Sequence, residues 1–295
     1  MEIKSTNILR GLGNRKIKDV PISEILSIFI KGILNGSINT RATSISFHFF
    51  MAMLPGIVFF FTLIPHLPVS GLEDASTSIL RDLLPERTSY SIIEIITGFA
   101  GKSAKIPIFS ILIATMFAMN GVNGVISAFN SSYHAIETRS WTQKRKISIV
   151  LVGILFVLLI VATCFIVFSK NLIQFLIDHN VVNKMFTVFM LQLGKWIVIY
   201  LLILMAISFT YYLAPADKKN WKFISHGSIV ASVLTVLASL IFTYIMNTFG
   251  KFNLLFGPAG TLMVVLLWIY FNALALLLGF EVNASINNAS FINKP

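Results

Sequence analysis

Residues 147–168 read ISIVLVGILFVLLIVATCFIVF, and this uninterrupted apolar stretch decides the class of fold. It contains no Asp, Glu, Lys or Arg, and it is long enough for the roughly 20 residues with which an α-helix crosses a hydrocarbon core. A membrane β-strand would instead alternate apolar and polar side chains over about 10 residues. The stretch therefore predicts a transmembrane helix.

Five other charge-free stretches support the same interpretation. Together the six predicted spans cover residues 43–67, 106–129, 147–168, 196–214, 227–248 and 255–280. The chain of 295 residues is 56% hydrophobic and 12% charged, about half the charged share of a soluble domain. We therefore predict an all-α integral membrane protein with about six transmembrane helices.

The distribution of Lys and Arg predicts the orientation in the membrane. The connections on the side of the two termini carry 15 of these residues, those on the opposite side carry 8, and the acids divide evenly. Because loops rich in Lys and Arg stay inside the cell, both termini are expected to be cytoplasmic. The net charge of +11 then points to anionic lipid headgroups as partners, rather than to nucleic acid.

The segments outside the spans suggest three parts of the chain. Residues 1–40 form a cytoplasmic segment, in which Pro21 precedes apolar residues at helical spacing and predicts an interfacial helix. Residues 41–284 form the membrane domain, and residues 285–295 form a cytoplasmic tail. The connection at 68–105 contains two short amphipathic stretches, which we interpret as external helices that cover the bundle or simply shield loop backbone.

Residues that could carry enzyme chemistry are sparse. The five histidines at 48, 66, 134, 179 and 226 are widely separated and lie at no ligand spacing from Asp or Glu, and the chain contains no Walker, Rossmann, HExxH or CxxC motif. A metallohydrolase needs a cluster of His and carboxylate ligands. We therefore expect no cofactor, no metal site and no enzyme.

Polar residues inside the predicted spans are the remaining candidates for a function. Amides and imidazoles are costly in lipid, so they should face protein or water. They could join helices to one another or line a polar path through the bundle, and the sequence leaves both alternatives open. This set includes His48 and Pro55 in the first span, Asn120, Asn123 and Asn130 in the second, Asn247 in the fifth, and Asn272 in the sixth.

Several motifs resemble the YihY/BrkB family of bacterial inner-membrane proteins, some of which are labelled "ribonuclease BN-like". The first is the stretch from Arg41 through His48 to Pro55. The second lies after the second span and includes Asn130, Tyr133 and Arg139. The third follows the family's Tyr-Gly-x-x-Gly, Leu-Trp-x-Tyr and Gly-x-Glu-x-Asn-Ala run, with Phe256 in place of the Tyr, and contains Gly257, Gly260, Trp268, Tyr270, Glu281 and Asn283.

The resemblance implies a six-span envelope protein without naming a reaction. Our first hypothesis is transport or handling of a lipid or another amphipathic envelope molecule. The alternative is a scaffold or regulatory protein that transports nothing. The ribonuclease label has no support among the residues and ranks third.

Three charged motif residues lie near the predicted cytoplasmic ends of spans. They are Arg41, Arg139 and Glu281. A carboxylate at partial membrane depth is costly when unpaired, and it gains from the fork of an arginine. We therefore predict that Glu281 pairs with one of the two arginines, the alternative being that headgroups solvate each charge separately.

Overall fold

The computed structural model describes residues 16–17, 20–63, 108–132, 138–178, 184–216, 222–248 and 252–292. Within these ranges, strands β1 (Lys16–Ile17) and β2 (Val20–Pro21) pair antiparallel ahead of the first helix. The other elements described are helical: α2 (Ile22–Asn35), α3 (Ile38–Leu63), α6 (Ile108–Asn130), α7 (Trp141–Asp178), α8 (Lys184–Leu213), α9 (His226–Thr248) and α10 (Phe252–Ile292).

The predicted class of fold is confirmed. Helices α6, α7, α8, α9 and α10 each contain a segment long and apolar enough to cross a membrane. Helix α3 covers most of the first predicted span, and its 26 residues correspond to a length of about 39 Å. The total of six spans stays a prediction, and the two short helices expected at 68–105 lie outside the described residues.

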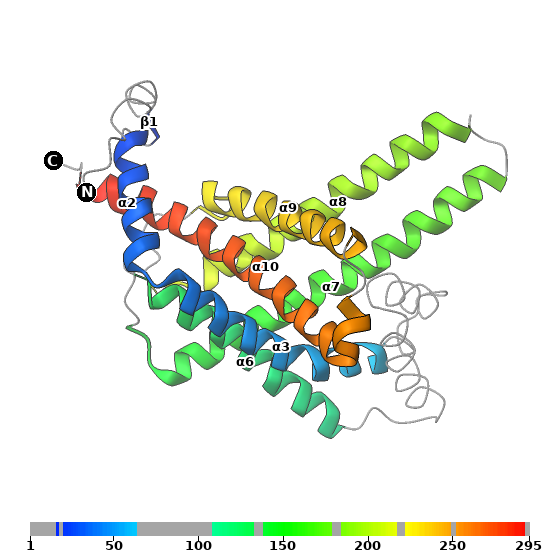
Figure 1. Cartoon of the computed structure of the whole chain (residues 1–295), viewed down its shortest axis with the longest axis horizontal. Coiled ribbons are helices and arrows are strands. Elements are labelled where there is room, and N and C mark those ends of the chain that lie inside the picture. Colours follow the sequence, from blue (N-terminus) through cyan, green and yellow to red (C-terminus); the bar gives the residue numbers. More distant parts are fainter. Residues whose placement is uncertain are drawn as a thin grey trace.

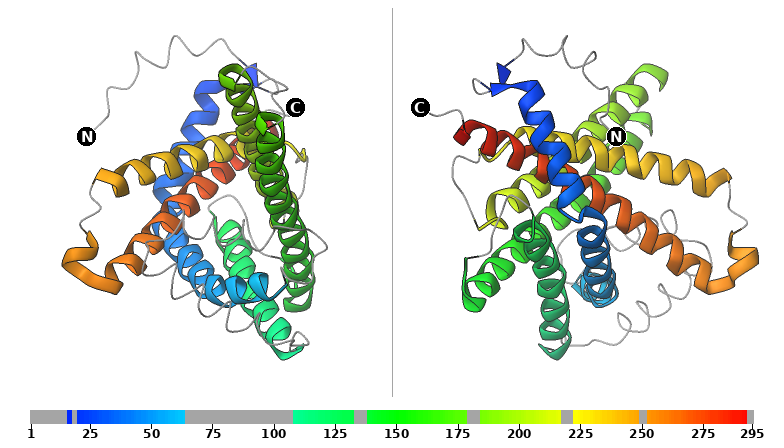
Figure 2. Two further views of the ribbon diagram at one scale, coloured as in Figure 1. Left: turned by 90° about the vertical axis from the view of Figure 1, so that its right-hand side faces the viewer. Right: turned by 60° about the vertical axis from the view of Figure 1, so that its left-hand side comes forward.

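The helices form a fan. In Figure 1 they converge at the side where α8 ends and α9 begins, and they spread apart toward the opposite side. Helix α3 lies beside α6, α9 lies beside α10, and α7 and α8 form a long hairpin that projects away from the others. Figure 2 shows the same divergence in two further views.

The buried core lies at the narrow end of the fan, which we call the hub. It takes residues from the first half of α3 and of α9, and from the second half of α6, α8 and α10. Its members include Ala42, Ile45, Ile126, Phe129, Ile207, Tyr211, Ala231, Leu277 and Phe280. Because these segments all lie on one side of the membrane domain, tight packing is concentrated there.

Helices α2 and α10 extend the hub beyond the predicted spans. Pro21 stands at the N-cap of α2, where its missing N–H costs nothing, and Ile25 packs against Ile286 and Ala289 of α10. Helix α10 continues to Ile292, so most of the predicted tail is helical. The predicted span ended at residue 280 because Glu281 closes the charge-free stretch, although Glu281, Asn283 and Ser285 are buried against protein.

Candidate functional site

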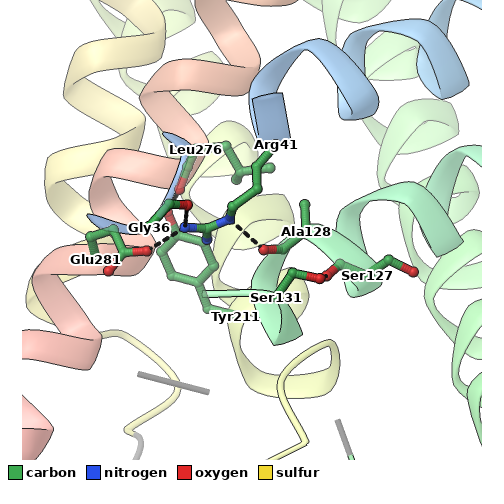
Figure 3. Close-up of polar contacts among 8 residues, drawn as sticks. All are labelled: Gly36, Arg41, Ser127, Ala128, Ser131, Tyr211, Leu276 and Glu281. Carbon is green, nitrogen blue, oxygen red and sulfur yellow. Dashed lines mark hydrogen bonds and ion pairs between the residues drawn. The ribbon is translucent and has the colours of Figure 1, made fainter. Parts of the chain in front are cut away.

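The centre of the hub is an ion pair between two distant parts of the chain. Arg41 Nη1 lies 2.7 Å from Glu281 Oε1, and the two side chains are 6% and 0% exposed. Arg41 Nε also donates to the carbonyl of Ala128, at 2.6 Å, and Nη1 donates to the carbonyl of Gly36, at 3.4 Å (Figure 3). One guanidinium group thus joins α3, α6, α10 and the turn between α2 and α3.

This arrangement confirms the predicted pairing of Glu281 with an arginine and identifies Arg41 as the partner. The alternative of charges solvated separately by headgroups is wrong for this pair, because protein buries both groups. Isolated charges are very costly away from water. The pair therefore requires that α3 and α10 stay together as long as both side chains are charged.

An aromatic cluster packs beside the ion pair. The rings of Phe129 and Phe280 stack with centroids 4.4 Å apart, and the Tyr211 ring meets both edge-on. The hydroxyl of Tyr211 donates to the carbonyl of Leu276 in α10. The three rings come from α6, α8 and α10, so apolar contact adds α8 to the helices α6 and α10 that the charged groups connect.

The motif residues Asn130 and Arg139 hold the C-terminal end of α8. Arg139 Nη2 donates to the carbonyl of Ala214 at 2.6 Å, and Asn130 Nδ2 donates to the same oxygen at 3.3 Å. Asn130 Oδ1 accepts from the backbone N–H of Ala216 at 2.9 Å. The last carbonyls of a helix lack intrahelical partners, and a cation there is favourable. Arg139 thus binds a helix end, whereas Arg41 binds Glu281.

The motif residue Asn283 binds the N-terminal end of α9. Its Oδ1 accepts from the backbone N–H of Gly227 at 2.8 Å, and its Nδ2 donates to Ser225 Oγ at 2.7 Å. Ser225 and Ser228 add reciprocal bonds between side chain and backbone. Gly227 and Gly279 allow this contact, since a Cβ on Gly279 would lie 2.5 Å from the Gly227 carbonyl oxygen.

Two amide side chains of α6 each form a hydrogen bond with α7. Asn120 Oδ1 accepts from Arg145 Nη1 at 3.2 Å, and Asn123 Oδ1 accepts from Ser148 Oγ at 2.6 Å. The two acceptors are three residues apart on α6, and the two donors are three residues apart on α7. This is the geometry expected of polar residues that join helices, which was one of the two alternatives for the set.

The remaining predicted site residues are dispersed. His48 is half-buried on α3, bonds Ser44 through Nδ1 at 2.7 Å and packs against Gly124. Pro55 lies inside α3, Asn272 bonds the carbonyl of Trp268 on its own helix, and Trp268 is exposed. Tyr270 reaches Asn39 at 3.5 Å. Gly257 and Gly260 belong to α10, but their surroundings lie outside the described residues, as does Tyr133.

Sequence reasoning missed several members of the hub. Tyr211, Ser225 and Gly227 were not selected, because a hydrogen bond between residues far apart in the chain leaves no periodic pattern. Gly279 entered only as the glycine of the Gly-x-Glu-x-Asn-Ala run. One signal was present: Gly227, Ala231 and neighbouring serines recur at small-xxx-small spacing, which is typical of close helix packing in membranes.

Comparison with known protein families matches the part of the chain that contains the hub. Residues 29–294 match the family described as virulence factor BrkB. The chain belongs to the BrkB family. The match spans every helix from within α2 to α10, so the hub described above lies inside the BrkB region. No solved structure matches the chain.

Two similar proteins carry general names. The putative ribonuclease-like protein YfkH of Bacillus subtilis (strain 168) is 25% identical over 250 residues, which cover 84% of this chain and 90% of YfkH. UPF0761 membrane protein NTHI0384 of Haemophilus influenzae (strain 86-028NP) is 22% identical over 267 residues, covering 88% and 94% of the two chains. The similarity therefore extends over nearly the whole of both relatives.

The polar side chains of the hub form an ion pair and cap helix ends. In the part of the chain that the structure describes, no three His, Cys, Asp or Glu side chains come together as metal ligands. The motif residues Arg41, Asn130, Arg139, Glu281 and Asn283 each bond a helix end or each other. They fix where six helices meet.

Proposed function

We propose that this BrkB-family membrane protein handles a lipid or another amphipathic envelope molecule in the bacterial inner membrane, with both termini in the cytoplasm. The observation that carries the proposal is the contrast between the two ends of the fan. The hub uses its polar groups on helix contacts, whereas the diverging halves of the helices present apolar side chains. A molecule with a hydrocarbon part would find its contacts on the diverging halves.

Helix α7 supports this contrast most directly. Val157 and Val161 are exposed on one face, and Leu159 is exposed as well. Successive residues of a helix turn by about 100°, so Leu159 points roughly opposite to the two valines. Leu262, Met263, Leu266 and Leu267 of α10 are also exposed over a wide arc. Hydrocarbon can therefore reach these helices from more than one side.

The test is to identify what binds and whether it moves. The full chain, purified in mild detergent, would be examined by mass spectrometry for bound lipids, and then placed in liposomes that contain a fluorescent phospholipid. We expect enrichment of one lipid class over the membrane average and faster exchange of the probe between leaflets than in protein-free liposomes. Lipids at membrane-average proportions together with unchanged exchange would contradict the proposal.

A scaffold without transport is the second candidate. It is favoured by the bonds of Asn120, Asn123 and Asn283, which use these amides to join helices. A scaffold should copurify with a stoichiometric protein partner after crosslinking in cells, and it should leave lipid exchange unchanged. The same two measurements therefore discriminate between the two candidates.

Ribonuclease activity is expected to be absent. The name of YfkH includes "ribonuclease-like", but the histidines of this chain are dispersed along the sequence. We predict that pure protein with added divalent metal does not cleave precursor RNA. Cleavage that a substitution in this chain abolishes would show that the interpretation of the histidines is wrong.

A further inference from the structure

Two atoms of the central ion pair remain without a hydrogen-bond partner. Among the described residues, none accepts from Arg41 Nη2 and none donates to Glu281 Oε2, although both atoms are fully buried. A bidentate contact would have used both carboxylate oxygens, but the pair meets through Nη1 and Oε1 alone. Glu281 therefore keeps one buried oxygen on which a proton could be held.

The pair also joins two groups of helices. Helix α3 packs along α6, α10 packs along α9 and carries α2, and α3 and α10 also pack directly against each other around the pair. Arg41 is fixed to the first group, because its Nε donates to Ala128 of α6, and Glu281 belongs to the second group. Figure 3 shows the guanidinium between the two carbonyl partners and the carboxylate. Neutralising the carboxylate would weaken the link between the groups while leaving Arg41 bonded to α6.

We propose that Glu281 is a proton-binding site and that proton uptake releases it from Arg41, so that α10 moves away from α3 and α6 at the hub. One proton from solution adds to Glu281 Oε2, the carboxylate becomes a neutral carboxylic acid, and Arg41 keeps its charge and its bond to Ala128. The role of this movement rests on the proposed function: separation of the helices would open the hub to an amphipathic molecule.

Other ionisable groups on the neighbouring elements are few. Helix α3 also carries His48, α2 carries Glu24 and Lys31, α8 contributes Tyr211, and α9 begins with exposed His226. The range of α6 contains no ionisable side chain. Within the described ranges, Glu281 forms its ion pair with Arg41, so its protonation acts on that contact first.

The experiment measures the distance between the two groups of helices. The exposed positions of Ser27 on α2 and Ser131 after α6 are labelled through Ser27→Cys and Ser131→Cys in a Cys164→Ala background. The spin-labelled protein is placed in liposomes. Pulsed electron resonance then gives the distance distribution at a series of pH values from neutral to acidic. We expect a shift to longer distances on acidification. The same shift should appear at every pH in Glu281→Gln.

Two variants keep the test decisive. Glu24→Gln removes a carboxylate from α2 outside the ion pair and should retain the pH response. Arg41→Gln with Glu281→Gln leaves no lone charge in the hub, so it should fold even where the single variant does not, and its distances should not respond to pH. A pH-independent wild type, or a pH response that persists without Glu281, would overturn the proposal. The pH response of the wild type and that of the variants are both measured as distances, so these results do not depend on whether the protein exchanges lipid.

Discussion

At the scale of single residues, the ion pair between Arg41 and Glu281 dominates the hub. Replacing one partner leaves the other charge buried and unpaired, which typically costs about 3–5 kcal/mol. We therefore expect Glu281→Gln to lower the melting temperature in detergent strongly. Exposed Lys31 provides the control, since Lys31→Gln should change stability by no more than about 0.5 kcal/mol.

A double-mutant cycle identifies the partner of Glu281. Once Glu281 is neutral, Arg41→Gln should cost less than it does in the wild type, because the two side chains share one interaction. Arg139→Gln in the same cycle should behave additively, since Arg139 binds the end of α8 instead. Equal losses for Arg41→Gln in both backgrounds would contradict the pairing.

The sequence could predict the charged residues of this site but not all of their contacts. Glu281 and an arginine were expected to pair because a lone carboxylate is costly at membrane depth. The choice between Arg41 and Arg139 depended on how α3 and α8 lie against α10, which charge patterns do not encode. The contact of Asn283 with Gly227 was missed for the same reason, although Asn283 itself was selected from the family motif.

At the scale of elements, the contact between α9 and α10 depends on two glycines. A Cβ on Gly279 would lie 2.5 Å from the Gly227 carbonyl oxygen and 2.6 Å from both Ala231 Cβ and the Tyr211 hydroxyl. Since backbone cannot yield cheaply, Gly279→Ala should destabilise the protein by about 1–3 kcal/mol in thermal or chemical denaturation. Gly153→Ala in α7 is the matched control, because nothing lies within 4 Å of its added Cβ, and it should be neutral or stabilising.

Capping of α9 by α10 gives a second prediction about elements. Asn283→Ala removes the acceptor for the Gly227 N–H and leaves a buried donor unpaired, which costs about 1–3 kcal/mol. Asn272→Ala should cost much less, because Asn272 bonds the Trp268 carbonyl within its own helix. Comparison of the two melting temperatures tests this difference, and equal losses would mean that the contact between helices contributes nothing.

The helices themselves were predictable because hydropathy reports them directly. Five of the six predicted spans coincide with helices that meet the length and hydropathy needed to cross a membrane. Where α10 ends was not predictable, because Asn283, Ser285 and Asn287 resemble a solvated tail in the sequence. Packing of α2 against Ile286 and Ala289 keeps this segment helical, and such long-range packing leaves no local signal.

At the scale of the whole molecule, the position of the hub depends on the orientation of the chain. The hub lies at the end of the fan where α8 ends and α9 begins, and the connections predicted for this side carry 15 of the 23 Lys and Arg residues. Retention of positively charged loops inside the cell would therefore place the hub at the cytoplasmic face. The diverging, apolar halves of the helices would then lie in the outer part of the membrane.

Reporter fusions test this orientation. Fusions at Asp217 and after Asn288 should be active with a cytoplasmic reporter, whereas a fusion near Arg87 should be active with an exterior reporter. Replacement of Lys144, Arg145 and Lys146 by glutamine is the informative variant, because it removes three of the positive charges that keep the loop before α7 inside the cell. In this variant, reporters fused to that loop should be the first to show activity on both sides of the membrane. An exterior C-terminus in the unaltered chain would require an odd number of spans or the reverse orientation. The reverse orientation would place the Arg41–Glu281 pair at the outer face of the membrane, whereas an odd number of spans would leave Arg41, which precedes the first predicted span, on the cytoplasmic side.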